Sequence, residues 1–250
     1  MGSGNMPSVH VLLKKEDIDA VKLAGDKIAV VFDVLLATST ITSALFYGAR
    51  EVIPVLNKEE ALKEANGRDP KTTILVGEMD GKPIEGFLVP HPTYLRNKVK
   101  DKTIILSTTN GTVAVRKASA AKTLYIGSIL NGQAAAETIL TRHRNESIVI
   151  VCSGSSGSFC LEDFYGAGYF LDCLVSGSEQ PLELTDAARA ALLFYRGTVA
   201  LGNKVLKSSS VGQMLVHYGL EDVVEYVIGR GTMPIVPYLA DKKRIIRGDF

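Results

Sequence analysis

Polar side chains follow several apolar segments of the chain, at the point where each segment ends. The clearest case is Asp33, which ends an apolar run and precedes the hydroxyl run Thr38-Ser39-Thr40. Similar residues recur at Glu78, at 108–112, at Ser128 with Asn131 and at 152–158. Hydroxyls and glycine amides can bind phosphate or sulfonate oxygens, whereas carboxylates repel such anions unless a hard cation lies between them. The residue types therefore predict a small anionic ligand together with a cation such as Mg²⁺.

A sheet is needed to bring these residues together. Short β-branched runs predict strands at residues 28–34, 51–55, 73–76, 103–106, 123–126 and 148–151. These runs are apolar on both faces, which is typical of buried and largely parallel strands. Helical periodicity between them predicts helices at residues 40–47, 58–65, 111–118, 131–143 and 161–174. Because ligands of open α/β sheets bind at the carboxyl ends of the strands, we expect the polar residues to share one crevice.

The C-terminal third differs from the rest of the chain. It predicts helices at 185–200, 210–217 and 221–227, followed by edge strands at 234–238 and 244–246. The fold class we expect is α/β, a three-layer α/β/α sandwich with a mainly parallel or mixed sheet and a helical C-terminal third. We expect residues 1–7 to be a flexible or non-native leader and residues 8–250 to form one domain.

Composition and charge exclude several classes of protein. The 28 basic and 27 acidic residues nearly balance, and no dense basic run occurs, so we expect no nucleic-acid partner. No apolar stretch is long enough to span a membrane, and the start of the chain has no apolar signal core, so we expect neither a membrane protein nor an exported one. Three cysteines without C-x-x-C spacing argue against a disulfide framework and fit the reducing cytoplasm.

Several of these residues also fit simpler structural roles. A Ser or Thr between strand and helix is more often a helix cap than a ligand, and acids such as Glu162 and Asp163 in a first helical turn often only complement the helix dipole. The four histidines are scattered and receive no role. Cys152 lacks the arginine that a cysteine phosphatase needs six residues later, where Ser158 stands. Phosphate-loop, nucleophile-elbow and dinucleotide motifs are also missing.

The ordered set of polar motifs resembles the 2-phosphosulfolactate phosphatase family over residues 8–240. The motifs are D-V-L-x-A-T-S-T (33–40), G-E (77–78) with G-F (86–87), T-T-N-G-T (108–112), G-S-x-L-N (127–131), C-x-G-x-x-G-x-x-x-L-E-D-x-x-x-A-G (152–168) and D-A-A (186–188). The resemblance implies a Mg²⁺-dependent phosphatase with an α/β/α fold that hydrolyses 2-phospho-3-sulfolactate to sulfolactate and phosphate. It also implies that Asp33 lies at the metal and that Thr38, Ser39 and Thr40 hold the anion.

The chain departs from the family where arginines are usual. Leu36, Met79 and Gln213 stand at three such positions, and Val89-Pro90-His91-Pro92 replaces the family's Gly-Asn-Ser-Pro. Arginine is the preferred bidentate partner of oxyanions, so its loss should weaken or redirect substrate binding. Two hypotheses follow. The chain is either a phosphatase for 2-phosphosulfolactate or a related phosphorylated hydroxy acid, or a non-catalytic protein that binds a small anion.

We favour the enzyme, because carboxylates without a metal would oppose anion binding. The predicted metal is Mg²⁺, with Asp33, Glu78 and Glu162 as ligands. Asp33, Glu162 and Asp163 are the predicted catalytic acids and bases, with the roles of the latter two left open. The predicted substrate-binding residues are Thr38, Ser39, Thr40, Thr108, Thr109, Asn110, Gly111, Ser128, Gly154 and Gly157. A small phosphorylated substrate is the expected partner, and a homodimer is allowed while the number of subunits is left open.

Overall fold

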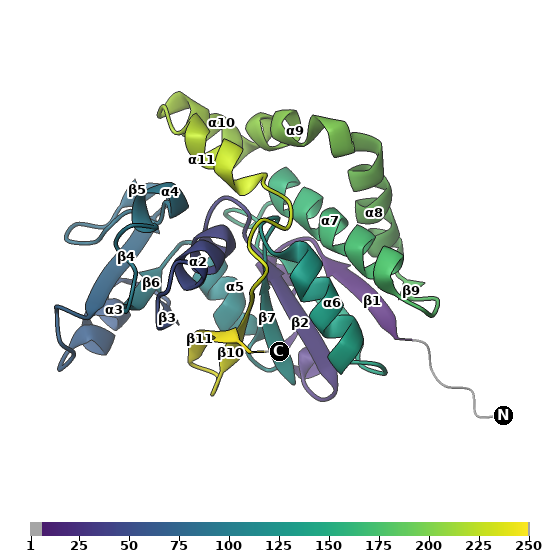
Figure 1. Cartoon of the computed structure of the whole chain (residues 1–250), viewed down its shortest axis with the longest axis horizontal. Helices are drawn as coiled ribbons and strands as arrows, with labels where there is room; N and C mark the ends of the chain where they lie inside the picture. The colour runs from purple at the N-terminus through teal and green to yellow at the C-terminus, as the bar shows by residue number, and fades with distance from the viewer. Residues whose placement is uncertain (1–6, 250) are drawn as a thin grey trace.

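A mixed sheet runs through the molecule in this computed structural model, which describes residues 7–249. The prediction for residues 1–6 lies outside that range. The strand order is β5-β4-β6-β3-β11-β10-β7-β2-β8-β1-β9 (Figure 1). The strands are β1 (Ser8–Leu12), β2 (Lys27–Phe32), β3 (Glu51–Val55), β4 (Thr73–Met79), β5 (Lys82–Pro83), β6 (Thr103–Ser107), β7 (Thr123–Gly127), β8 (Ser147–Cys152), β9 (Glu183–Leu184), β10 (Val236–Ala240) and β11 (Arg244–Gly248).

Two parallel groups of strands make up most of the sheet. One group is β7-β2-β8-β1-β9 and the other is β3-β6-β4. The antiparallel hairpin β10–β11 joins them, since β10 pairs with β7 and β11 pairs with β3. Each junction has one pair of residues in register, Tyr238 with Tyr125 and Ile245 with Val52.

The hairpin corrects one prediction, because its strands were expected at an edge of the sheet and lie in the middle. Pro237 and the flanking charged residues are typical of an edge strand, since proline cannot donate to a ladder of hydrogen bonds. Pro237 and these charged residues are tolerated in the middle of the sheet because the hairpin pairs with each neighbouring group of strands through one pair of residues in register, Tyr238 with Tyr125 and Ile245 with Val52. A second difference is β1, which sequence patterns did not predict. It pairs in parallel with β8, which places the residues that follow it near the other strand ends.

Helices cover both faces of the sheet. They are α1 (Ala20–Leu23), α2 (Ala37–Phe46), α3 (Lys58–Ala65), α4 (Pro92–Leu95), α5 (Gly111–Ala118), α6 (Gly132–Arg142), α7 (Leu161–Gly177), α8 (Asp186–Thr198), α9 (Gly202–Ser208), α10 (Ser210–His217) and α11 (Glu221–Val227), with 3₁₀ turns η1 (Lys15–Asp17) and η2 (Val199–Leu201). Among residues 7–249, no helix is long and apolar enough to cross a membrane.

The side chains of β2 show how the layers form. Ile28, Val30 and Phe32 belong to a core with residues of α6, α7 and α8. Ala29 and Val31 point to the other face and join a core with residues of α2 and α5. Strand side chains alternate between faces, so a strand that is apolar throughout can bury both faces under helices. This arrangement confirms the predicted α/β/α layering.

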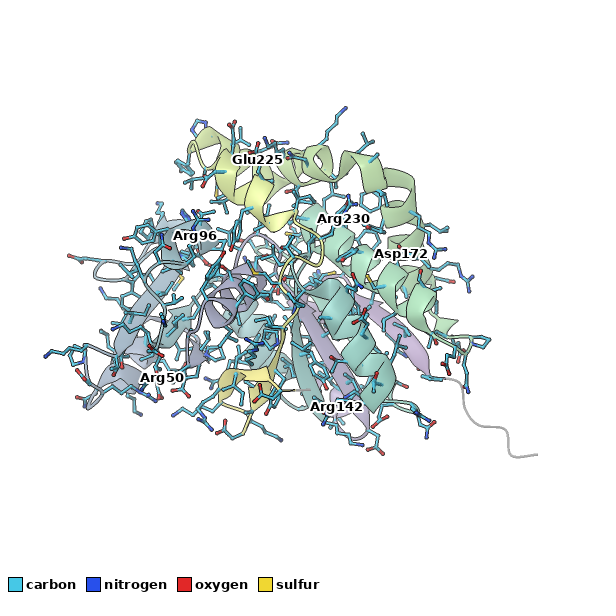
Figure 2. All side chains as sticks on the ribbon, in the orientation of Figure 1. Arg50, Arg96, Arg142, Asp172, Glu225 and Arg230 are labelled. Atoms are coloured by element: carbon cyan, nitrogen blue, oxygen red, sulfur yellow. The ribbon has the colours of Figure 1, made fainter. Side chains whose placement is uncertain are left out.

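The C-terminal third is mostly helical, as predicted. Helix α8 packs on α7, while α9, α10 and α11 lie across the top of the molecule in Figure 1. The side chain of Met214 on α10 reaches the turn between β4 and β5, where its Sδ lies 3.1 Å from the place that a Cβ on Gly81 would occupy. Helix α10 therefore covers the end of β4. The arginines labelled in Figure 2 lie far apart, at Arg50, Arg96, Arg142 and Arg230, so these four do not form one basic patch.

Candidate active site at the carboxyl ends of the strands

A cavity of about 480 Å³ lies where strands of both parallel groups end. Its walls come from the segments after β2, β4, β6 and β8, from residues 89–91 and from the region of α10. The lining residues are Asp33, Leu35, Leu36, Ala37, Glu78, Asp80, Gly81, Lys82, Pro83, Val89, Pro90, His91, Thr108, Thr109, Asn110, Ser155, Ser156, Val211, Met214, Leu215, Tyr218 and Leu220. The structure thus brings five predicted site residues together: Asp33, Glu78, Thr108, Thr109 and Asn110.

Asp33 is a buried acid on the cavity wall, and its pKa is raised. Its side chain is 8% exposed, and Oδ1 accepts a hydrogen bond from the backbone N–H of Ala37 at 3.2 Å. Burial raises the pKa of Asp33 to about 7, and the charges of Glu78 and Glu162 add to the increase. A carboxylate with a pKa near 7 can both carry charge and accept a proton at neutral pH.

Gly111 lets the start of α5 approach Asp33. A Cβ at this position would lie 2.6 Å from Oδ2 of Asp33 and 2.4 Å from the Cβ of Ala37. Any side chain would therefore push α2 and α5 apart. Gly111 was predicted to bind substrate, but it does not line the cavity and its packing explains why a glycine is needed there.

Glu78 is held between two turns. Its Oε1 accepts a hydrogen bond from the N–H of Thr109 at 2.7 Å, and its Oε2 accepts from the Thr109 hydroxyl at 3.0 Å and from the N–H of Gly81 at 2.8 Å. The Thr109 hydroxyl also accepts from the N–H of Asp80 at 2.7 Å. Thr109 therefore fixes Glu78 in the cavity, and both oxygens of Glu78 keep lone pairs for a further partner.

Asn110 connects the cavity to a lysine that sequence patterns missed. Lys15 is 6% exposed, and its ammonium group donates to Oδ1 of Asn110 at 2.8 Å. It also pairs with Glu16 at 3.0 Å and opposes the increase in the pKa of Asp33. The signal was present in the sequence, because two lysines come one residue after the alternating run Ser-Val-His-Val-Leu that forms β1. Because the sequence patterns did not predict β1, they did not indicate that Lys15 lies near the end of a strand.

The hydroxyl run after Asp33 faces the interior. The Thr38 hydroxyl donates to the carbonyl of Asp33 at 2.9 Å and accepts from the N–H of Asp33 at 3.0 Å. The Ser39 hydroxyl donates to the carbonyl of Val34 at 2.8 Å, and the Thr40 hydroxyl donates to Pro90 at 2.6 Å. These side chains are at most 1% exposed and do not line the cavity. In this structure they lie in the first turn of α2 and hold the loop that carries Asp33 through its backbone groups.

Three other predicted binding residues also lie away from the cavity wall. Ser128 is fully buried, and its hydroxyl donates to Oδ1 of Asn131 at 2.9 Å. Gly154 has a positive φ of 65°, and a Cβ there would lie 2.6 Å from the carbonyl oxygen of Ser158. Gly157 has a φ of 76°, and its carbonyl accepts a hydrogen bond from Lys14 at 3.0 Å. The two glycines shape the loop that brings Ser155 and Ser156 to the cavity.

Asp163 joins two loops of the site from behind. Its Oδ1 accepts from the N–H of Val34 at 2.8 Å, and its Oδ2 accepts from the N–H of Gly154 at 3.1 Å. Burial raises the pKa of Asp163 well above its usual range, and the charges of Asp33 and Glu162 act in the same direction. The loops after β2 and β8 are therefore held together by one side chain.

Glu162 is 2% exposed and lies close enough to Asp33 to raise the pKa of that residue. Burial raises the pKa of Glu162 itself, while hydrogen bonds with the side chains of Ser209 and Cys160 oppose the increase. Neither Glu162 nor Asp163 lines the cavity. The structure therefore places both predicted acids in the supporting layer around Asp33.

The donors on the cavity wall fit a hard divalent cation. Within residues 7–249, no group of three or more His, Cys, Asp or Glu side chains is arranged to hold a metal ion. Mg²⁺ does not require such a group, because it is commonly bound by one or two carboxylates while waters and substrate oxygens complete the octahedron. Asp33 and Glu78 supply two carboxylates to the same cavity.

Cys152 and His91 differ in their access to the cavity. Cys152 is fully buried at the end of β8, does not line the cavity, and burial raises its thiol pKa well above the usual range. A thiolate nucleophile is therefore not favoured. His91 received no role from the sequence but lines the cavity, and burial lowers its pKa.

The departures from the family pattern divide into two sets. Leu36 and the segment Val89-Pro90-His91 line the cavity. Met79 and Gln213 do not, and the amide of Gln213 donates to the carbonyl of Ser208 on the outside of α10. We therefore expect the departures at Leu36 and residues 89–91 to change the chemistry of the cavity wall relative to the family pattern.

The cavity lies at the carboxyl ends of the strands of an α/β sheet, which is where open α/β sheets in general bind their ligands. The model of the family described as 2-phosphosulpholactate phosphatase matches residues 12–242. A protein of Clostridium beijerinckii named "Probable 2-phosphosulfolactate phosphatase" is 35% identical over 237 residues, which cover 94% of this chain and 98% of the relative. One of the same name from Clostridium acetobutylicum is 38% identical over 233 residues, covering 92% and 96% of the two chains. The chain therefore belongs to the 2-phosphosulfolactate phosphatase family, a family of phosphoric monoester hydrolases.

Proposed function

We propose that this protein is a Mg²⁺-dependent phosphatase that hydrolyses 2-phosphosulfolactate or a related phosphorylated hydroxy acid. The observation that carries the proposal is the pairing of Asp33, whose pKa is raised to about 7, with Glu78 in one cavity at the strand ends. The relatives named as 2-phosphosulfolactate phosphatases support the choice of reaction.

Asp33 and Glu78 would hold the metal ion. Bound Mg²⁺ would neutralise phosphate charge and polarise the phosphorus toward attack. The hydrogen bonds of Thr109 and Gly81 keep the Glu78 carboxylate in place, and the N–H of Ala37 orients Asp33. Each carboxylate is thereby positioned before a ligand arrives, which lowers the cost of binding.

Asp33 is also the group we propose to accept a proton from the attacking water. It is the buried acid of this cluster that reaches the cavity, and a carboxylate oxygen left free of the metal can accept a proton there. Glu162 and Asp163 would act by positioning. Asp163 holds the backbone on either side of the site, and Glu162 adds to the increase in the Asp33 pKa that burial causes.

Asn110, Ser155 and Ser156 are the polar groups proposed to contact the anion. Asn110 is anchored by Lys15, and the N–H of Ser156 lies 3.4 Å from Oδ1 of Asn110. Lys15 would contribute positive potential from behind this wall, since it is buried and does not itself line the cavity. Charge-assisted hydrogen bonds of this kind polarise the amide that meets the ligand.

We extend the proposal to a reducing compartment such as the cytoplasm, because Cys152, Cys160 and Cys173 are free thiols.

Phosphate release is the experiment that tests the function. The purified protein would be incubated with 2-phosphosulfolactate and with 2-phospholactate, in excess EDTA and after addition of MgCl₂. We expect release with both esters in Mg²⁺ and none in EDTA. Binding of an ester without release under either condition would support the alternative, a non-catalytic anion-binding protein, and would contradict the phosphatase.

A further inference from the structure

The cavity has two chemically different walls. The segments that follow the strands supply acids, hydroxyls and an amide on one side. The other side is apolar, and its main residues are Leu35, Leu36, Val211, Met214, Leu215 and Leu220. A ligand group that lies against these side chains is removed from water, which favours an apolar group over a charged one.

One face of α10 builds much of the apolar wall. Val211, Met214, Leu215 and Tyr218 follow the spacing of a single helical face, and all four line the cavity. Met214 lies against Gly81 on the opposite turn, so the helix is packed onto the acidic side of the cavity. The apolar wall therefore belongs to the same cavity as the acids and is not a separate surface.

Positive charge is scarce on the walls. Among the lining residues described here, Asp33, Glu78 and Asp80 are acidic, Lys82 is the one lysine, and arginine is absent. His91 is the remaining titratable base, and burial lowers its pKa. A divalent cation at Asp33 and Glu78 could balance a phosphate, and Lys82 could pair with one carboxylate. A further sulfonate would be left against apolar side chains, where an unpaired charge loses its hydration.

We infer that the preferred substrate is the phosphate ester of a 2-hydroxy acid whose side chain is uncharged and apolar, either alkyl or aryl. This inference rests on the proposed phosphatase function and specifies its substrate class. The phosphate ester supplies two anionic groups, the phosphate and the carboxylate, for which the cavity has partners, and the apolar side chain packs on the wall built by α10. A cavity of about 480 Å³ lies within the range that accommodates such a ligand.

Binding of the product acids tests the inference without requiring turnover. The probes are phenyllactate, 2-hydroxyisocaproate, lactate and sulfolactate, which share the hydroxy acid and differ in one substituent. Calorimetry in MgCl₂ should show phenyllactate binding at least about tenfold more tightly than sulfolactate, which is about 1.4 kcal/mol. Equal or tighter binding of sulfolactate would overturn the inference, as would undetectable binding of phenyllactate.

Two lysine substitutions on α10 locate the effect. Met214→Lys places a cation on the apolar wall, so the preference for phenyllactate over sulfolactate should fall at least about tenfold. Gln213→Lys adds the same charge to the exposed side of the helix, outside the cavity, and should leave the preference unchanged. An unchanged preference in Met214→Lys would overturn the inference. If circular dichroism shows that Met214→Lys is unfolded, Met214→Gln provides a smaller polar change. The preference for phenyllactate should also fall in Met214→Gln, and an unchanged preference there would overturn the inference as well.

Turnover of the four matching phosphate esters answers a separate question. Release of phosphate from none of them would contradict the proposed phosphatase function, whereas the order of binding of the acids decides the substrate class by itself. Among esters that are hydrolysed, kcat/KM should be highest for the phenyl or isobutyl compound. Highest kcat/KM for 2-phosphosulfolactate would overturn the inference.

Discussion

Two hydroxyl-rich segments, each comprising the loop after a strand and the start of the following helix, have different roles in this molecule. After β2, the hydroxyls of Thr38, Ser39 and Thr40 are buried and bonded to backbone groups. After β6, Thr109 and Asn110 are half-buried and line the cavity. The first loop presents a single carboxylate, Asp33, and uses its hydroxyls to hold it. The second presents its polar side chains directly.

The difference shows that residue type alone does not identify a ligand contact. A buried hydroxyl is destabilising without a hydrogen-bond partner, and a loop that folds back on its own backbone provides carbonyls for that purpose. Thr109 instead bonds Glu78, a side chain that itself lines the cavity. The role of a hydroxyl therefore follows from the partner that accepts its hydrogen bond.

The largest effect is expected for Asp33→Asn. The amide lacks the charge that a hard cation prefers and cannot act as a base, so phosphate release in MgCl₂ should fall by at least about 100-fold. Asp101→Asn, at an exposed position outside the cavity, should remain active. Equal rates of phosphate release for the two variants would show that Asp33 is not needed for the reaction.

The same variant should reveal the cost of burying Asp33. The folded-state pKa of about 7 exceeds the ordinary value of 3.8, so the folded protein holds a proton that the unfolded chain releases. Wild-type stability should therefore fall as pH rises between these values, while Asp33→Asn escapes this loss. In EDTA, the variant should gain roughly 3 kcal/mol of unfolding free energy relative to wild type between about pH 5 and about pH 8. Urea denaturation at both pH values measures the gain, and a constant difference would contradict the raised pKa.

A matched pair of valine substitutions separates the two loops. Thr38→Val leaves the buried N–H of Asp33 without its partner, so the free energy of unfolding should fall by about 1–3 kcal/mol. Thr109→Val removes one of the three hydrogen bonds that hold Glu78, at a half-buried position, so kcat/KM should fall by about tenfold with a smaller change in stability. Thermal unfolding and phosphate release measure both quantities. The interpretation of the two loops would be reversed if Thr109→Val were the more destabilising substitution and left activity intact.

A smaller change is expected for Lys15→Met. Lys15 anchors Asn110 and opposes the increase in the pKa of Asp33, so its removal should raise that pKa further and move the acidic limb of the pH–rate profile to higher pH. Lys22→Met, at an exposed position, serves as the control. A merely structural role would lower stability and leave the profile in place.

The fold was largely predictable because most strands carry apolar residues on both faces and most helices show clear periodicity. Helices α3, α5, α10 and α11 begin and end where the sequence predicted. The hairpin β10–β11 could not be placed, since a short strand with Pro237 has the same local pattern at an edge as at a junction. Strand β1 was missed, and with it Lys15.

The candidate site was predictable at the level of loops more than of side chains. The rule that ligands bind at the carboxyl ends of strands brought Asp33, Glu78 and 108–110 to one cavity. It could not show that Asp163 bonds to Val34 and Gly154, because those partners come from distant parts of the chain. Nor could it show the apolar wall, because α10 reaches the cavity only through the packing of the C-terminal helices.

Magnesium binding tests the central claim most directly, namely that the loop after β2 exists to present Asp33 to a cation shared with Glu78. Mg²⁺ would be titrated by calorimetry into wild type, Asp33→Asn and Glu78→Gln, each in the presence of sulfolactate and again with phenyllactate. We expect one site in the wild type and at least about a tenfold loss of affinity in each variant. Unchanged magnesium affinity in both variants would contradict the account.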